Sequence, residues 1–167
     1  LVFIIPFLYF IITRQLDKST IKKTIILLIL GGFQGFLGWY MVKSGLVDRP
    51  DVSHYRLAAH LTTAFVTFAF TLWVALDLIF PIKQTINKTY RNLIRIGLAI
   101  LFIQIIYGAF VAGLDAGFIH NHWPMMSEGK LMHETVLTEK TPVYKNFIEG
   151  RSGVQFVHRI LAFIVVI

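Results

Sequence analysis

Long uninterrupted apolar runs constrain this chain more than any other feature of its sequence. Three runs, residues 21–42, 55–80 and 93–112, each reach the length of about 20 residues that a helix needs to cross a bilayer core. Shorter apolar runs, 1–12 and 154–167, occupy the two ends. Because backbone groups in lipid must find partners within the spanning segment, these runs predict an all-α fold, a polytopic membrane protein built as a transmembrane helical bundle.

The composition narrows the class further. Hydrophobic residues make up 56% of the chain, more than is typical of soluble domains, and the mean hydropathy is +0.67. A net charge of +7 would suggest a nucleic-acid partner in a soluble protein, but here the positive-inside rule accounts for it, so no nucleic acid is expected. These residues include no cysteine, which excludes a disulfide framework or a thiolate metal site within them.

The charges between the apolar runs predict how the helices are oriented. Lys and Arg dominate in and beside loops 13–20 and 81–92, whereas loops 43–54 and 113–153 mix both signs. By the positive-inside rule, the first two loops are expected on the cytoplasmic side and the other two on the outer side.

The two ends and an internal repeat predict how the chain is organised. As a helix, residues 1–12 would cover only about 18 Å of a core of about 30 Å, so we expect an interior fragment of a larger protein, cut through a helix at both ends. "QGFLGWYMV" (34–42) and "QIIYGAFVA" (104–112) each place a Gln four residues before a Gly. Each is followed by an outer loop and an inward helix with a His near its start, which predicts a duplicated bundle.

The stretch "YRLAAHLTTAFVT" places ionisable residues in a membrane span, where they are costly and usually face the bundle interior. At about 100° per residue, Arg56, His60, Thr63 and Thr67 share one stripe that is small and polar below the histidine. Such a slot suits a haem, with His60 on the iron and Arg56 paired with a propionate. The alternative is an interfacial histidine bonded to a loop carbonyl, with Arg56 snorkelling to water.

The last apolar run, within "SGVQFVHRILAFIVV", repeats this pattern. His158 lies near the outward-facing start of the run, with Arg159 beside it and Gln155 one turn earlier. The same interfacial alternative applies to His158. Two helices of the same polarity nevertheless favour haem ligands, because membrane haems are commonly held by histidines and neutral imidazole suits iron.

Gln34 lies on a face that it shares with Gly31, Gly35 and Gly38. Close helix packing is the simpler interpretation of this small-residue face, although a glutamine in a span needs a partner, which keeps a binding role open. No nucleophilic triad, phosphate loop or paired-carboxylate site is recognisable in the sequence.

The remaining polar candidates receive plainer interpretations. His120 and His122 form a His-x-His pair that could take a metal, but no third ligand is near, so they are interpreted as solvated loop histidines. His54 and His133 receive the same interpretation. Asp77, near the inner end of its run, is expected to reach the cytoplasmic water.

Three stretches carry a resemblance to a known family: "GGFQGFLGWYMVKSGLVDRPDVSHYRLAAHL", "YGAFVAGLDAGFIHNHWPMM" and "QFVHR". In sequence and order they resemble the haem A synthases of the alphaproteobacterial and mitochondrial type, over about half of a family protein. The resemblance implies eight transmembrane helices in two pseudo-symmetric four-helix bundles, in a bacterial inner membrane with its outer loops in the periplasm. It also implies oxidation of the C8 methyl group of haem O to a formyl group, giving haem A for cytochrome oxidase.

The resemblance also implies a division of the chain. Residues 1–80 would supply helices two to four of the amino-terminal bundle, and 81–92 a cytoplasmic linker. Residues 93–167 would supply helices five and six of the carboxyl-terminal bundle, with the long outer loop 113–153.

The site residues follow from the same mapping. His60 would bind the iron of the amino-terminal site and His158 that of the carboxyl-terminal site, with haem b as cofactor and haem O as substrate. Further cofactor-binding residues would be Arg56, Gln34 and Arg159. The second ligand of the amino-terminal iron and the family's important glutamate are expected upstream of Leu1. The second ligand of the carboxyl-terminal iron is expected beyond Ile167, so this stretch alone is expected to be inactive.

Particular partners are also expected, and two alternative functions stay open. The partners are membrane lipid, haem O, haem O synthase and cytochrome oxidase assembly factors. A di-haem b-type electron carrier fits the histidines equally well but not the motifs, and predicts electron transfer without a haem product. A non-catalytic membrane transporter or assembly factor with structural histidines predicts no bound haem.

Overall fold

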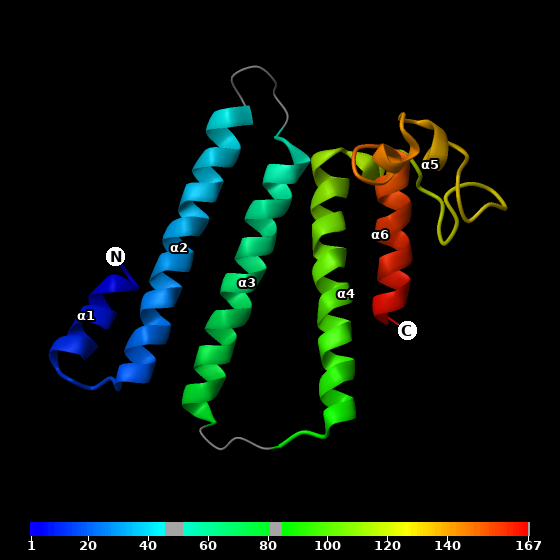
Figure 1. Ribbon diagram of the computed structural model, residues 1–167. Helices are drawn as coiled ribbons and strands as arrows, with labels where there is room; N and C mark the ends of the chain where they lie inside the picture. Colours follow the sequence, from blue (N-terminus) through cyan, green and yellow to red (C-terminus); the bar gives the residue numbers. More distant parts are fainter. Residues whose placement is uncertain (46–51, 81–84, 167) are drawn as a thin grey trace. The chain divides into compact units, whose positions relative to one another are not determined.

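The computed structural model describes residues 1–45, 52–80 and 85–166. Within them the chain is helical, with no β-strand, which confirms the predicted all-α class (Figure 1). The elements are α1 (Ile4–Ile12), α2 (Lys18–Gly45), α3 (His54–Ile79), α4 (Lys88–Gly113), η1 (Ala116–Phe118), α5 (Thr135–Thr138), η2 (Val143–Phe147) and α6 (Arg151–Val166).

Three helices are long and apolar enough to cross a membrane: Lys18–Lys43, His54–Ile79 and Lys88–Gly113. They coincide with the three long apolar runs of the sequence. A mean hydropathy of 1.7 to 2.2 over these segments, with little of their surface buried inside the protein, is typical of helices whose sides face lipid.

Helix capping makes two of these helices longer than their apolar runs. The side chain of Asn87 accepts a hydrogen bond from the backbone N–H of Thr89 at 2.9 Å, so α4 begins at Lys88 rather than at residue 93. The Asp17 carboxylate likewise accepts from two backbone N–H groups at the start of α2. Loops 13–20 and 81–92 are therefore shorter than predicted, and residues 81–84 lie outside the described part.

One compact unit comprises Leu1–Phe36 and Thr63–Gln84. In it the Lys23 ammonium group forms an ion pair with the Asp77 carboxylate and lies 5.2 Å from the centroid of the Trp73 ring. Both charged side chains are about four-fifths buried. The expectation that Asp77 simply reaches water is therefore wrong, because a lysine on α2 neutralises it.

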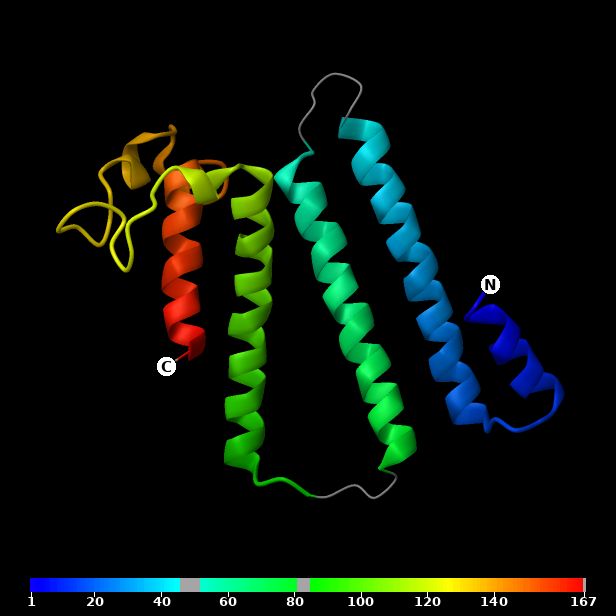
Figure 2. The ribbon, with the colours of Figure 1, turned by 180° about the vertical axis from the view of Figure 1, so that it is seen from behind.

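The second compact unit comprises Leu37–Thr62 and Thr85–Ile167. Here α4 and α6 lie side by side in both views (Figures 1 and 2). A cluster of buried residues fills the contact, and its members are Ala58, Ala109, Phe110 and Val154. The predicted assignment of residues to two four-helix bundles concerns a longer protein and stays a prediction.

The start of α3 meets the end of α4 at a glycine. A Cβ atom added to Gly113 would lie 2.7 Å from the Cα of His54, so the two backbones approach as closely as they do because residue 113 has no side chain. The His54 ring stands edge-on to Phe110, with centroids 5.2 Å apart. His54 is half-buried, and its interpretation as a solvated loop histidine is wrong.

Asn146 organises the outer loop between α5 and α6. Its fully buried side chain donates to the carbonyls of Leu137, Lys140 and Val143 at 3.1, 3.0 and 2.9 Å, and its Oδ1 accepts from the Lys140 N–H at 2.7 Å. One amide thus satisfies four backbone groups of an irregular segment, as buried backbone requires. A Cβ on Gly153 would lie 2.2 Å from the Asn146 carbonyl oxygen, so α6 packs directly on this turn.

The same loop holds the first turn of α6. The Glu139 carboxylate accepts hydrogen bonds from the backbone N–H groups of Arg151 and Ser152, both at 3.0 Å. A carboxylate at the amino-terminal end of a helix satisfies its free donors and opposes the helix dipole.

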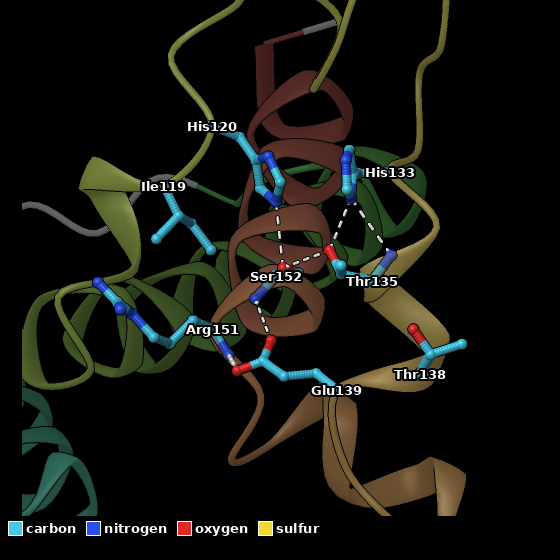
Figure 3. Close-up of a pocket in the computed structure, with 8 residues that line it drawn as sticks. All are labelled: Ile119, His120, His133, Thr135, Thr138, Glu139, Arg151 and Ser152. Atoms are coloured by element: carbon cyan, nitrogen blue, oxygen red, sulfur yellow. Dashed lines mark hydrogen bonds between the residues drawn. The ribbon is translucent and has the colours of Figure 1, made fainter.

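Two loop histidines join this arrangement through hydroxyl groups (Figure 3). His120 Nε2 lies 3.1 Å from Ser152 Oγ, Thr135 Oγ1 donates to Ser152 Oγ at 2.8 Å, and His133 Nδ1 lies 2.7 Å from Thr135 Oγ1. The two imidazole centroids are 4.7 Å apart. His120 and His133 are half-buried and hydrogen-bonded, so their interpretation as solvated histidines is wrong, whereas the exposed His122 fits it.

We expect the outer loop to loosen in acid. Burial, and then the nearby His133 and Arg159, lower the pKa of His120, against a smaller opposite effect of Glu139. Since the folded loop favours the neutral ring, the stability that His120 contributes is complete above its ordinary value of about 6.5 and is lost as pH falls through its lowered pKa. The protection factors for amide hydrogen exchange of residues 119–140, which correct for the pH dependence of intrinsic exchange, should fall as the pH is lowered from 7.5 to 5. The slope should flatten in His120→Gln, and an equal slope in both proteins would contradict this origin.

The contact at Gly113 predicts a second effect on stability. Gly113→Ala should destabilise the protein by about 1–3 kcal/mol, because the new methyl group overlaps the backbone of His54. Gly97, on the same helix, has nothing within 4 Å of an added Cβ and provides the matched control. Thermal unfolding in detergent should give a lower midpoint for Gly113→Ala and an equal or higher one for Gly97→Ala, since alanine is the better helix former. Equal midpoints for the two variants would show that the close approach is unimportant.

Candidate functional site

His60, in the second turn of α3, packs against bare backbone of α2. A Cβ added to Gly38 would lie 3.3 Å from His60 Cε1, 3.9 Å from Nδ1 and 4.0 Å from Nε2. The imidazole therefore occupies the space that any other side chain at position 38 would fill. Of the glycines on the face predicted for helix packing, Gly31 and Gly35 have open space around them, and Gly38 alone meets the histidine.

His158, in the second turn of α6, repeats this contact on α4. A Cβ added to Gly108 would lie 3.3 Å from His158 Cε1 and 3.9 Å from Nδ1. The closest distance is the same as at Gly38, and a glutamine precedes each glycine by four residues. The repeat seen in the sequence thus has a counterpart in side-chain geometry: a histidine near the start of one helix rests on a glycine of the preceding helix. We call each such pair a His–Gly step.

The surroundings of the second step contain polar atoms that lack partners. Gln104 Oε1 and Gln155 Oε1 are buried and make no hydrogen bond within the part of the chain that the structure describes. Buried polar atoms in native proteins nearly always have a partner. Their clustering on α4 and α6 near one imidazole is typical of a site that takes a further group.

The other predicted residues of the first site take defined positions. The Arg56 guanidinium group, one turn before His60, lies 4.8 Å from the centroid of the Tyr40 ring, a cation–π contact near the first turn of α3. Gln34 is half-buried on α2, one turn before Gly38 along the helix. It belongs to a different compact unit from His60.

Arg159, expected beside a cofactor, holds a loop. Its Nη1 donates to the carbonyls of His122 and Met125 at 2.8 and 2.9 Å, and its Nη2 donates to the carbonyl of His120. Sequence analysis missed this contact because the acceptors are backbone carbonyls, which no residue type marks. A guanidinium group carries more N–H donors than these three bonds use, so the loop contact and a cofactor contact are compatible.

A pocket of about 400 Å³ opens beside the second compact unit's outer loop (Figure 3). It is lined by Ile119, His120, His133, Thr135, Thr138, Glu139, Arg151 and Ser152. The backbone N and the Oγ1 of Thr135 lie 3.2 and 2.7 Å from His133 Nδ1, so this ring nitrogen is already engaged within the loop. His120 turns its Nε2 to Ser152. This chemistry disfavours a metal bound between the two imidazoles and favours a structural role for the pair.

Comparison with known proteins agrees with these features. The COX15-CtaA family, described as cytochrome oxidase assembly protein, matches residues 1–167. The Heme A synthase of Flavobacterium johnsoniae is 64% identical over 99% of the chain, that of Flavobacterium psychrophilum 62% over 99%, and that of Parvibaculum lavamentivorans 42% over 100%.

The matches cover only part of the relatives' own length. The chain covers 49%, 49% and 48% of the three proteins, so it spans about half the length of the curated relatives it matches. No solved structure matches it. The family match over every residue, with relatives of up to 64% identity, identifies the chain as a member of the COX15-CtaA family of cytochrome oxidase assembly proteins.

Proposed function

We propose that this chain is part of a haem A synthase, an oxidoreductase that converts the C8 methyl group of haem O to a formyl group and so supplies haem A for cytochrome oxidase. The observation that carries the proposal is the pair of His–Gly steps, because each presents an imidazole against flat, unobstructed backbone. The relatives named Heme A synthase support the reaction.

In this proposal His60 binds the haem iron of an amino-terminal site and His158 that of a carboxyl-terminal site. Both imidazoles lie about one and a half turns or more inside their helices, and ionisable groups inside membrane spans are usually functional. Each histidine would be one of two ligands of its iron. The second ligands and the family's glutamate are expected outside these 167 residues, so the chain alone is expected to be inactive.

The glycines and arginines would hold and orient the cofactor. Gly38 and Gly108 fix the rotation of the two imidazole rings, since each ring edge rests on a backbone that has no side chain. Arg56, over Tyr40 at the outer end of α3, would pair with a propionate, and Gln34 and Arg159 would complete the cofactor contacts. Haem b, when bound, would carry the electrons that leave haem O on oxidation to an external acceptor, while the apolar helices around it exclude water.

The orientation and partners belong to the same proposal. Loops 13–20 and 81–92 would lie in the cytoplasm, and loops 43–54 and 113–153 in the periplasm of a bacterial inner membrane. Both His–Gly steps then lie near the periplasmic side. Partners would be haem O synthase, which supplies the substrate, and cytochrome oxidase assembly factors, which receive the product.

The test uses the full-length protein, purified in detergent from cells that make haem O. Extracted haems are separated by liquid chromatography with mass detection, for the wild type and for His60→Met and His158→Met. We expect haem A and its hydroxylated precursor in the wild type, and their loss in His60→Met, because the substrate would lose a ligand. Haem b alone, with both variants merely losing absorbance, would favour a di-haem electron carrier. Absence of haem from a folded wild type would favour a non-catalytic assembly factor.

The His–Gly steps yield a prediction that does not require turnover. Gly38→Ala and Gly108→Ala each place a methyl group 3.3 Å from an imidazole carbon, so the ring must shift. The shift needed is a few tenths of an ångström, so the cost lies at the low end of the ~1–3 kcal/mol of overpacking, and about 1 kcal/mol corresponds to a haem affinity lowered about fivefold. Haem content and the Soret absorbance of the purified variants measure this effect. Gly35→Ala, with open space around it, is the control, and an equal haem content in all three variants would contradict the proposed role of the steps.

A further inference from the structure

The loop that follows η1 folds back along α6 instead of extending into solvent. Residues 120–125 run beside one stripe of the helix, formed by Gln155, Arg159 and Phe163 at intervals of four residues. Gln155 Nε2 donates to the His120 carbonyl at 3.1 Å. We call this segment the flanking loop.

The side chains of this stripe hold the flanking loop at three successive turns of α6. Below Gln155, Arg159 donates to the carbonyls of His120, His122 and Met125. One turn further, the Trp123 ring stacks on Phe163 with centroids 5.1 Å apart and an interplanar angle of 21°.

Arg159 is the centre of this arrangement. The planar guanidinium group presents donors in a fixed fork, so it can serve several carbonyls at once, which the compact ammonium group of lysine cannot do in the same geometry. The carbonyls of His122 and Met125 are bound by Arg159 itself. An irregular backbone at membrane depth is tolerated only where its polar groups find partners, and Arg159 provides them here.

The flanking loop lies close to His158 both around the axis of α6 and along it. Arg159 follows His158 directly, so its side chain leaves the helix about 100° further round the axis. A group held by the His158 imidazole would be much wider than one helical position, so the flanking loop would be its neighbour on this side of α6. There the loop would separate the bound group from water.

We propose that Arg159 is a positioning residue that holds the flanking loop as the outer wall of the site at His158. This rests on the proposed function in that the bound group is a haem. Without the arginine the wall would open and water would reach the edge of the bound haem, which favours the charged ferric state. The wall would thus keep the reduction potential of the haem high.

Arg151 provides a matched control. It also lies on α6, and its Nη2 also donates to a loop carbonyl, that of Asp115, at 2.8 Å. Its partner lies outside the flanking loop. Arg151→Gln therefore removes an equivalent charge and an equivalent bond without releasing residues 120–125.

The first test measures the loop directly and needs no haem. Met126, which directly follows the flanking loop, is 1% exposed, and these 167 residues contain no cysteine, so Met126→Cys supplies a buried reporter thiol once any cysteine elsewhere in the full-length protein is replaced. In the full-length protein, maleimide should label it slowly in the otherwise wild-type background and about tenfold faster with Arg159→Gln, because the open state becomes more populated. Arg159→Lys should resemble Arg159→Gln, and Arg151→Gln should resemble the wild type.

The second test measures the site in the haem-loaded protein. Arg159→Gln should lower the midpoint potential of the haem bound at His158. Arg159→Lys, which keeps the charge, should lower it as well, while Arg151→Gln leaves it unchanged. Unchanged labelling in Arg159→Gln, or faster labelling with an unchanged potential, would overturn the proposal. A folded wild type without haem would contradict the proposed function, and with it the role of the flanking loop as a wall. The labelling rate would then test only whether Arg159 holds the loop.

Discussion

The contact between an imidazole ring and a bare glycine backbone is the constraint on which the candidate sites depend. It occurs at His60 with Gly38 and again at His158 with Gly108, with the same 3.3 Å between the ring carbon and the position of a Cβ. Helices in a membrane approach closely where small residues line the contact. Here a histidine ring lies in the space beside the glycine, so the glycine sets both the distance between the helices and the rotation of the ring.

The second site depends on α6 being held firmly, although that helix is shorter than the three spanning ones. Its first turn is capped by the Glu139 carboxylate and packs on the turn organised by Asn146. Further along, Arg159 binds the flanking loop while the neighbouring His158 faces Gly108. Helix α6 thus carries the candidate ligand His158 on one face and binds the flanking loop on the neighbouring face. The outer loop therefore helps to hold the helix that carries the candidate ligand.

Much of the fold could be predicted from the sequence, because the long apolar runs leave no soluble alternative and the histidines stand out against them. The helix ends could not, since they depend on caps such as Asn87, which extends α4 into residues interpreted as a linker. The loop residue His120 was misjudged for a related reason: its partners, Ser152 and the fork of Arg159, come from a distant helix. Side-chain bonds to backbone carbonyls leave no mark in the residue types.

For the candidate site, the sequence identified His60 and His158 and the matched Gln and Gly positions, and the structure added which glycine meets which ring. The sequence pattern could not show that Gly38 contacts a histidine and Gly31 does not, because both glycines lie on one face of α2. Only the position of α3 distinguishes them. The iron ligation, the propionate contacts and the sidedness of the loops stay predictions, since each depends on groups beyond these residues.

Electron paramagnetic resonance of the oxidised full-length protein tests the central claim most directly. If the His–Gly steps hold haem, the spectrum contains low-spin ferric signals with nitrogen coupling from axial imidazole, and replacement of His60 or His158 alters one signal and leaves the other. Ferric signals that persist unchanged when both histidines are replaced, or a folded protein without any, would contradict it.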